Sequence, residues 1–86
     1  MGVYLIVYDL RDSDHDYDGL HAALAAINAK RVHESVWGVN TSSSADGVFE
    51  HLWQHMHSGR DRLFVIPFDK SCDYRADNSV HMLKDI

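Results

Sequence analysis

The run VYLIVYD at residues 3–9 constrains this chain more than any other feature, because it is apolar on both faces of a β-strand. A strand that needs cover on both sides is expected near the centre of its sheet. The run ends in Asp9, so the strand delivers a carboxylate to its carboxyl end. A strand holds a functional side chain in a fixed position, which makes Asp9 the first candidate functional residue. The alternative is that Asp9 only begins the following turn, where Asp is common in any protein.

The length of 86 residues, with one Pro and five Gly, indicates a single domain over residues 1–86. We expect its core in residues 3–68 and find only a weak signal in the tail, 69–86. The sequence has no apolar run near 18 residues and no basic region before its first apolar stretch, which predicts a cytoplasmic protein that does not enter a membrane. The single Cys72 has no second cysteine for a disulfide or a metal knuckle.

The formal charge of −5, from 8 Lys and Arg against 13 Asp and Glu, argues against tight nonspecific binding to phosphate backbones. Such binding requires the few cations to gather on one face, and the candidates are Arg11, Arg31, Arg60 and Arg62. Protonation of the seven His below about pH 6.5 would remove much of the negative charge. Any binding of nucleic acid is therefore expected to be weak and dependent on pH.

An apolar stripe at helical spacing predicts a first helix of about three turns after the acidic loop 10–16. The stripe consists of Leu20, Ala23, Leu24 and Ile27. A carboxylate favours the amino end of a helix, so Asp16 or Asp18 is expected to cap it. Asn28 or a neighbour is expected to end it.

A second helix is predicted after the run TSSSADG at residues 41–47, which is typical of turns and helix caps. The helix is expected to stop at Ser58 and Gly59. Its stripe consists of Phe49, Leu52, Trp53 and Met56.

Two further regions have the composition of strands. The run RVHESVWGVN at residues 31–40 is long enough for one strand that bends into another, and Gly38 is the candidate for the bend or a bulge. The run RLFVIPF at residues 62–68 is again apolar on both faces, and Pro67 places its end at an edge or a terminus. Residues 80–83 are a candidate for a short extra strand at the C-terminal end.

The order of these elements predicts an α+β protein, a ferredoxin-like βαββαβ sandwich with two helices on one face of a four-stranded antiparallel sheet. Helices would then cover only one face of that sheet. Because the first and last strands are apolar on both sides, the other face requires a partner. A symmetric homodimer is the commonest solution.

These residues resemble a known family. The strand ends in Tyr8-Asp9, the segment RVHESVWGV follows at residues 31–39, and DRLFVIPF follows at residues 61–68. Over residues 3–68 the chain looks like the CRISPR-associated Cas-two superfamily, which includes stand-alone relatives and the related VapD-type toxins. The resemblance implies a ferredoxin-like homodimer. It also implies either a metal-dependent nuclease acting on RNA or DNA, or a noncatalytic scaffold for a partner protein.

The resemblance assigns roles to four positions. Asp9 matches the acid that lies near the dimer axis and binds a divalent ion, and Tyr8 matches its aromatic neighbour. Trp37 falls where the family often has Phe, and Arg31 matches a basic residue at the start of the second strand. Two Asp9 carboxylates close to a twofold axis would repel, and a shared Mg²⁺ or Mn²⁺ would relieve that repulsion while polarising a phosphate oxygen.

Other residues carry weaker signals. His33 is a candidate proton carrier or base contact, because it lies on the same predicted strand and has the same parity as Ser35 and Trp37, although a structural His is the more frequent outcome. Arg11 and Arg31 are candidate phosphate contacts. Four aromatic side chains could stack on bases, although strand aromatics more often belong to a core or an interface; they are Tyr4, Tyr8, Trp37 and Phe68.

Two metal patterns are incomplete. Asp14, Asp16 and Asp18 with Gly19 match the first half of a calcium loop, but the twelfth position is Ala25 instead of Glu, so an acidic loop before a helix is the better interpretation. A helical spacing that could hold zinc occurs at His51, His55 and His57. No Glu lies between the first two, and the helix places them on its solvent side or margin.

The sequence therefore predicts a homodimeric Cas-two-like protein that hydrolyses phosphodiesters with a metal or otherwise handles nucleic acid. The proposed site has Asp9 as metal ligand and catalytic acid, shaped by Tyr8 and Trp37. The competing prediction is a noncatalytic dimeric scaffold or toxin-like interaction module. It is favoured by the acidic balance and by the run DSDHDYDG at residues 12–19, where nuclease members usually carry Lys and Arg. A small-ligand sensor on the same fold has no glycine-rich loop to favour it.

Overall fold

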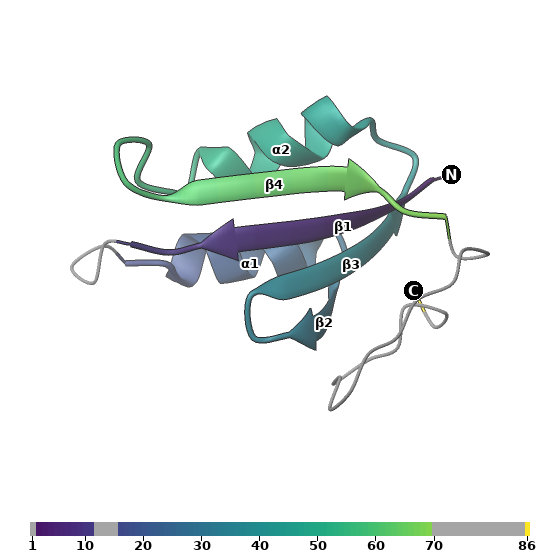
Figure 1. The fold of residues 1–86 in the computed structure, drawn as a ribbon, viewed down its shortest axis with the longest axis horizontal. Helices are drawn as coiled ribbons and strands as arrows, with labels where there is room; N and C mark the ends of the chain where they lie inside the picture. Colours follow the sequence, from purple (N-terminus) through teal and green to yellow (C-terminus); the bar gives the residue numbers. More distant parts are fainter. Residues whose placement is uncertain (1, 12–15, 70–85) are drawn as a thin grey trace.

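The computed structural model describes residues 2–11, 16–69 and 86. The elements are β1 (Gly2–Asp9), α1 (Asp18–Ala26), β2 (Lys30–His33), β3 (Val36–Thr41), α2 (Ala45–Trp53) and β4 (Arg62–Pro67). The protein is α+β, with a four-stranded antiparallel sheet in the order β2-β3-β1-β4 and two helices, an arrangement consistent with a ferredoxin-like fold (Figure 1). Among the described residues, no helix is both long and apolar enough to cross a membrane.

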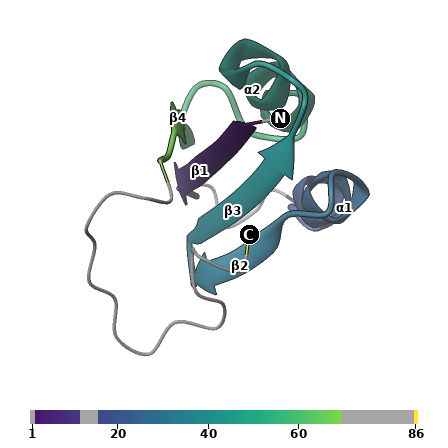
Figure 2. The same ribbon diagram turned by 90° about the vertical axis from the view of Figure 1, so that its right-hand side faces the viewer.

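The first strand lies in the interior of the sheet, as its two apolar faces predicted, with β3 on one side and β4 on the other. Both helices lie on one face of the sheet, and the opposite face carries neither of them (Figure 2). On the helix side, Ile6 is completely buried and Tyr8 is 7% exposed. The core there also includes Leu20, Leu24, Val39 and Leu52. The alternation along a strand directs Val3, Leu5 and Val7 to the open face, where each is half-buried.

The first helix buries the predicted stripe, with Leu20, Ala23 and Leu24 inside. It ends at Ala26 with Ile27 as the C-cap, close to the predicted end, and the next residue, Asn28, has a left-handed φ of 59°. The N–H of Asn28 donates to the carbonyl of Ala25, and the N–H of Ala29 donates to that of Leu24, both at 3.0 Å. These two bonds form a Schellman motif, so Asn28 occupies the position that glycine usually fills.

The prediction that Asp16 or Asp18 caps this helix is wrong. The cap position is Tyr17, and its side chain makes no capping hydrogen bond. Asp18 is already the first helical residue, which leaves Asp16 one position too early. The Asp16 carboxylate instead accepts from the N–H of Asp18 at 2.9 Å, a local Asx turn before the helix.

The second helix begins as predicted in the serine run, where the Ser44 hydroxyl accepts from the N–H of Gly47 at 3.1 Å. It ends at Trp53, earlier than the predicted stop at Ser58 and Gly59. Its buried side is centred on Val48 and Leu52. Phe49 and Trp53 are half-buried at the margin and stack on each other with ring centroids 5.4 Å apart.

The prediction of a bend or bulge at Gly38 is also wrong. The chain turns at Glu34 and Ser35, and Gly38 lies inside β3 opposite Leu5. The irregular pairing falls in β2, between Arg31 and His33. Gly38 has a different role, because a Cβ there would lie 3.0 Å from Cγ1 of Ile86. The fourth strand ends at Pro67 on the sheet edge, as predicted. The expected strand at residues 80–83 and Cys72 lie outside the described residues.

A buried carboxylate joins the loops at one end of the fold. Asp61 is only 6% exposed and lies just before β4. It accepts the backbone N–H groups of Arg11 and His57, each at 2.8 Å. The phenol oxygen of Tyr17 lies 2.6 and 2.7 Å from its two carboxylate oxygens. Asp61 therefore connects the segment after β1, the residue before α1 and the loop after α2.

Asp61→Ala should lower the free energy of unfolding by about 3 kcal/mol, because two backbone N–H groups and a phenol in partly buried hydrogen bonds lose a charged acceptor. Urea unfolding followed by circular dichroism measures this value. Glu50→Ala, at an exposed position of α2, is the matched control and should change stability by no more than about 0.5 kcal/mol. Equal losses for the two variants would contradict the role given to Asp61.

Asn28→Val should destabilise the protein by about 1–2 kcal/mol, because a β-branched residue is strained at a left-handed φ. Asn28→Gly should keep or slightly raise stability, since glycine accepts this conformation without strain. Thermal unfolding of both variants measures the difference. A valine variant as stable as the glycine variant would exclude the left-handed helix end.

Candidate functional site

Asp9 lies at the end of β1, opposite Arg62 at the beginning of β4. Its side chain is 54% exposed, and its Oδ2 lies 3.2 Å from Nη1 of Arg11, which is 51% exposed. The alternation along β1 places Asp9 on the same face as Val7, the open face of the sheet. The carboxylate is therefore accessible and already has one cationic neighbour.

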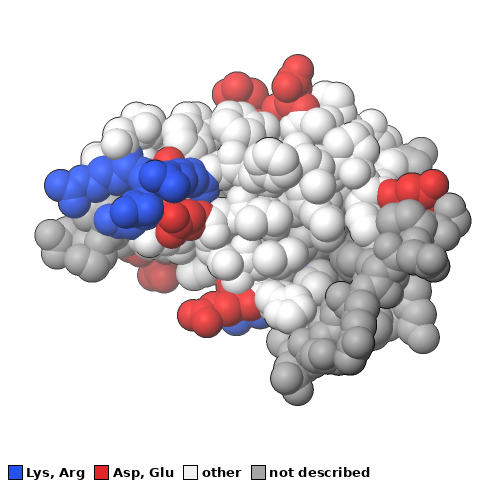
Figure 3. All heavy atoms as spheres, in the orientation of Figure 1, with Lys and Arg blue, Asp and Glu red and all other residues white. Residues whose placement is uncertain are grey.

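Three exposed arginines lie at this end of the molecule. Arg11 follows β1, Arg60 lies in the loop before β4, and Arg62 begins β4. Figure 3 looks onto the open face and shows the Lys and Arg side chains gathered where β1 ends and β4 begins, with acidic side chains among them. The tertiary structure thus brings together three of the four arginines whose sequence positions are scattered. Arg31 lies elsewhere, on β2.

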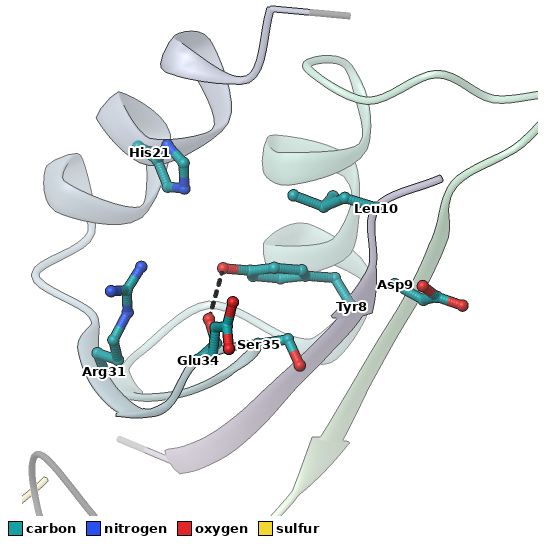
Figure 4. Close-up of a pocket in the computed structure, with 7 residues that line it drawn as sticks. All are labelled: Tyr8, Asp9, Leu10, His21, Arg31, Glu34 and Ser35. Carbon is teal, nitrogen blue, oxygen red and sulfur yellow. Dashed lines mark hydrogen bonds between the residues drawn. The ribbon is translucent and has the colours of Figure 1, made fainter. Parts of the chain in front are cut away.

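Tyr8 and Trp37 form a hydrogen-bonded pair on the helix side of the sheet. Nε1 of Trp37 donates to the Tyr8 hydroxyl at 2.9 Å, and that hydroxyl donates to the main-chain carbonyl of Glu34 at 3.3 Å. The guanidinium carbon of Arg31 lies 5.0 Å from the centre of the Trp37 ring, a cation–π distance. Tyr8, Trp37 and Arg31 are therefore brought together. The Asp9 carboxylate points away from Tyr8 and Arg31 (Figure 4).

A pocket of about 330 Å³ lies between α1, the end of β1 and the turn between β2 and β3. Its lining residues are Tyr8, Asp9, Leu10, His21, Arg31, Glu34 and Ser35 (Figure 4). Three predicted site residues line it: Tyr8, Asp9 and Arg31. The sequence analysis missed His21 and Glu34, which belong to an exposed helix face and a turn. His21 becomes a neighbour of Arg31 only in the folded chain, whereas Glu34 lies three residues after Arg31.

His33 does not share a face with Trp37, so the parity argument for it is wrong. The turn at Glu34 and Ser35 separates the two residues into different strands, and His33 pairs with Val36 while Arg31 pairs with Trp37. His33 is exposed. Neither His33 nor Arg11 lines the pocket described above, and neither takes part in the hydrogen bond between Trp37 and Tyr8.

The open face is mainly apolar between its charged ends. The strand register aligns Val7 with Val36 and Phe64, and Leu5 with Gly38 and Ile66. Phe64 is 58% exposed and is the one large hydrophobic side chain exposed among the described residues. Ile86 packs on this face, because a Cβ on Gly38 would lie 3.0 Å from its Cγ1.

The structure groups no three His, Cys, Asp or Glu side chains for a metal within residues 2–11, 16–69 and 86. Of the histidines considered for zinc, His51 places its Nε2 3.0 Å from the main-chain carbonyl of Ala23. Asp14, from the calcium-like run, lies outside the described residues. Among the described residues, Asp9 is therefore a single carboxylate ligand without a protein partner set for a metal.

The scan of the chain against protein-family models gives no match.

Proposed function

We propose that this protein is a homodimer of the Cas-two-like, ferredoxin-like type that handles nucleic acid, with metal-dependent phosphodiester hydrolysis at Asp9. The observation that carries the proposal is the position of Asp9. It is an exposed carboxylate at the end of an interior strand, on the open face, beside the exposed arginines Arg11 and Arg62. Cations bind and orient the phosphates, and the acid supplies an oxygen ligand.

The homodimer rests on the apolar open face. Val7, Phe64 and Ile66 lie on adjacent strands there, and neither α1 nor α2 covers them. A twofold pairing of two such faces would bury Phe64 and could bring the two Asp9 side chains toward one another. Each chain would then supply one carboxylate to a shared site.

The residues at this site fit a hard divalent ion such as Mg²⁺ or Mn²⁺ in part. Asp9 supplies a carboxylate, the donor that these ions prefer, and its exposure leaves room for water ligands. Bound there, the ion would supply charge neutralisation and polarisation of a phosphate oxygen. Arg11 competes for the same carboxylate oxygen, so a substrate phosphate that attracts the guanidinium would free Asp9 for the metal.

The second candidate function is a noncatalytic dimeric scaffold or toxin-like interaction module. The ion pair between Asp9 and Arg11 favours it, because this pair neutralises the acid without any metal. In that case the arginine end binds a protein or nucleic-acid partner and no bond is cleaved.

Asp9→Asn should reduce cleavage of RNA or DNA in Mg²⁺ or Mn²⁺ by at least about a hundredfold, because it removes the proposed metal ligand. Binding of the same RNA or DNA should be retained or become tighter, because the substitution removes one negative charge from the end of the molecule that carries the arginines. Gel assays of cleavage and fluorescence anisotropy of binding measure the two effects. Asp46→Asn, which removes an exposed acid in α2, is the control and should leave both unchanged.

Cleavage that persists in Asp9→Asn would exclude Asp9 as the catalytic acid. The scaffold function predicts no cleavage by the unaltered protein in either metal, together with binding that Arg11→Met and Arg62→Met both weaken.

Phe64→Lys should convert the dimer into a monomer, because a charge on the open face would be buried in the twofold contact. Light scattering coupled to size exclusion measures the mass. Gln54→Lys adds the same charge at an exposed position after α2 and should leave the dimer intact. A monomeric unaltered protein, or a dimer that tolerates lysine at position 64, would contradict the proposed interface.

A further inference from the structure

One wall of the pocket between α1 and the β2–β3 turn carries two nitrogen-rich side chains. His21 from α1 and Arg31 from β2 both point into the same space (Figure 4). Arg31 is half-buried and lies over the indole of Trp37, which restrains its guanidinium. A restrained planar fork of N–H donors suits a phosphate group, and the nearby imidazole adds a further donor.

The other side of the pocket is polar and acidic. Glu34 and Ser35 lie at the turn, and Glu34 is exposed. Asp9 also lies at the rim, where Arg11 neutralises it. A ligand that is only an anion would be repelled by Glu34. The pocket therefore fits a molecule with a phosphate at one end and hydrogen-bond donors at the other. The amino groups of nucleobases are such donors, and a carboxylate can accept a hydrogen bond from them.

The size and the apolar part of the pocket limit the ligand further. Leu10 and the ring of Tyr8 supply apolar surface beside the charged groups. The volume of about 330 Å³ lies at the small end of ligand pockets, which run from about 300 to 1,000 Å³. A duplex does not fit this description, because its base edges are paired and stacked. An unpaired base can enter a pocket and be read on its edge.

We propose that this pocket binds one unpaired nucleotide, either a free nucleoside monophosphate or the terminal residue of a single strand. Arg31 and His21 bind the phosphate, Leu10 contacts the sugar or base, and Glu34 accepts from the base. The choice of a nucleotide rests on the proposed handling of nucleic acid. The binding itself is independent of a metal at Asp9, whose carboxylate points away from the space between His21 and Arg31.

Titration of the ¹⁵N-labelled protein with CMP, UMP, ribose 5-phosphate and inorganic phosphate tests the proposal without metal. CMP should shift the amide resonances of His21, Arg31, Glu34 and Ser35 together and saturably. Ribose 5-phosphate and inorganic phosphate should bind at least about tenfold more weakly, because they lack the base. Inorganic phosphate that binds as tightly as CMP would overturn the proposal, as would the absence of saturable shifts in these residues.

Variants test each contact. Arg31→Met should weaken CMP binding about tenfold, as expected for a charged hydrogen bond. His21→Gln should weaken it about threefold and is safe for folding, because His21 is exposed on α1. Lys30→Met removes an exposed cation next to Arg31 and is the matched control, with no change expected. CMP should bind more tightly than UMP, because the amino group of cytosine donates to Glu34. Glu34→Gln should reduce that preference and strengthen the binding of inorganic phosphate. Unchanged binding in both Arg31→Met and His21→Gln would overturn the proposal.

The source of the nucleotide is decided by comparing CMP with a short single strand that carries a terminal phosphate and with the same strand in a duplex. Tighter binding of the strand assigns the site to nucleic-acid ends, and tighter binding of CMP assigns it to free mononucleotides. Equal shifts of the pocket amides by the duplex would contradict the need for an unpaired base. Loss of cleavage in Asp9→Asn with normal CMP binding separates this proposal from the catalytic one. Cleavage of nucleic acid by a protein that binds no mononucleotide would contradict the nucleotide pocket and leave the proposed hydrolysis at Asp9 standing.

Discussion

The alternation of side chains along β1 is the constraint on which the rest of this structure depends. Because neighbouring residues of a strand point to opposite faces, β1 packs Ile6 and Tyr8 against the helices while Val7 and Asp9 reach the open face. An interior strand that is apolar on both sides connects the core to a surface that lacks helices. The same rule separates Tyr8 and Asp9, which are adjacent in sequence, into two environments.

This separation gives the molecule two distinct chemical regions at one end. On the open face, Asp9 lies with Arg11 and Arg62 beside an apolar patch that includes Phe64. On the helix side, Tyr8 is bonded to Trp37, and the pocket lies beyond it. A nucleic-acid strand that follows the arginines on the open face would pass close to the pocket rim, where Asp9 and Leu10 lie. The two proposals are therefore compatible in space, although each depends on different residues.

Asp61 is buried at this end of the fold and stabilises it through hydrogen bonds. Its carboxylate holds the backbone of Arg11, and Arg11 in turn contacts Asp9. It also holds Tyr17, just before the helix that carries His21. A buried carboxylate is costly unless it is fully hydrogen-bonded, and here the partners come from three separate segments. One buried acid thus fixes the loops around both candidate regions.

Local patterns in the sequence determined the elements: the two-sided strand at β1, the apolar stripe of α1 ended by Asn28, and the cap of α2 at Ser44. These features depend on neighbours within a few residues, which periodicity and capping rules describe well. The sequence also located Asp9 at a strand end. The same rules failed at Asp16 and Asp18 by one position, and at Gly38 because a turn at Glu34 and Ser35 carries no glycine or proline signal.

Only the tertiary structure decided which distant residues meet. The contact between Asp61 and Tyr17, the gathering of Arg11, Arg60 and Arg62, and the position of His21 opposite Arg31 all depend on strand order and on helix packing across the sheet. No local rule encodes such contacts, because their free energy comes from groups far apart in the chain. The sequence by itself therefore determined the strands, helices and one candidate acid, and the packing of those elements decided what surrounds that acid.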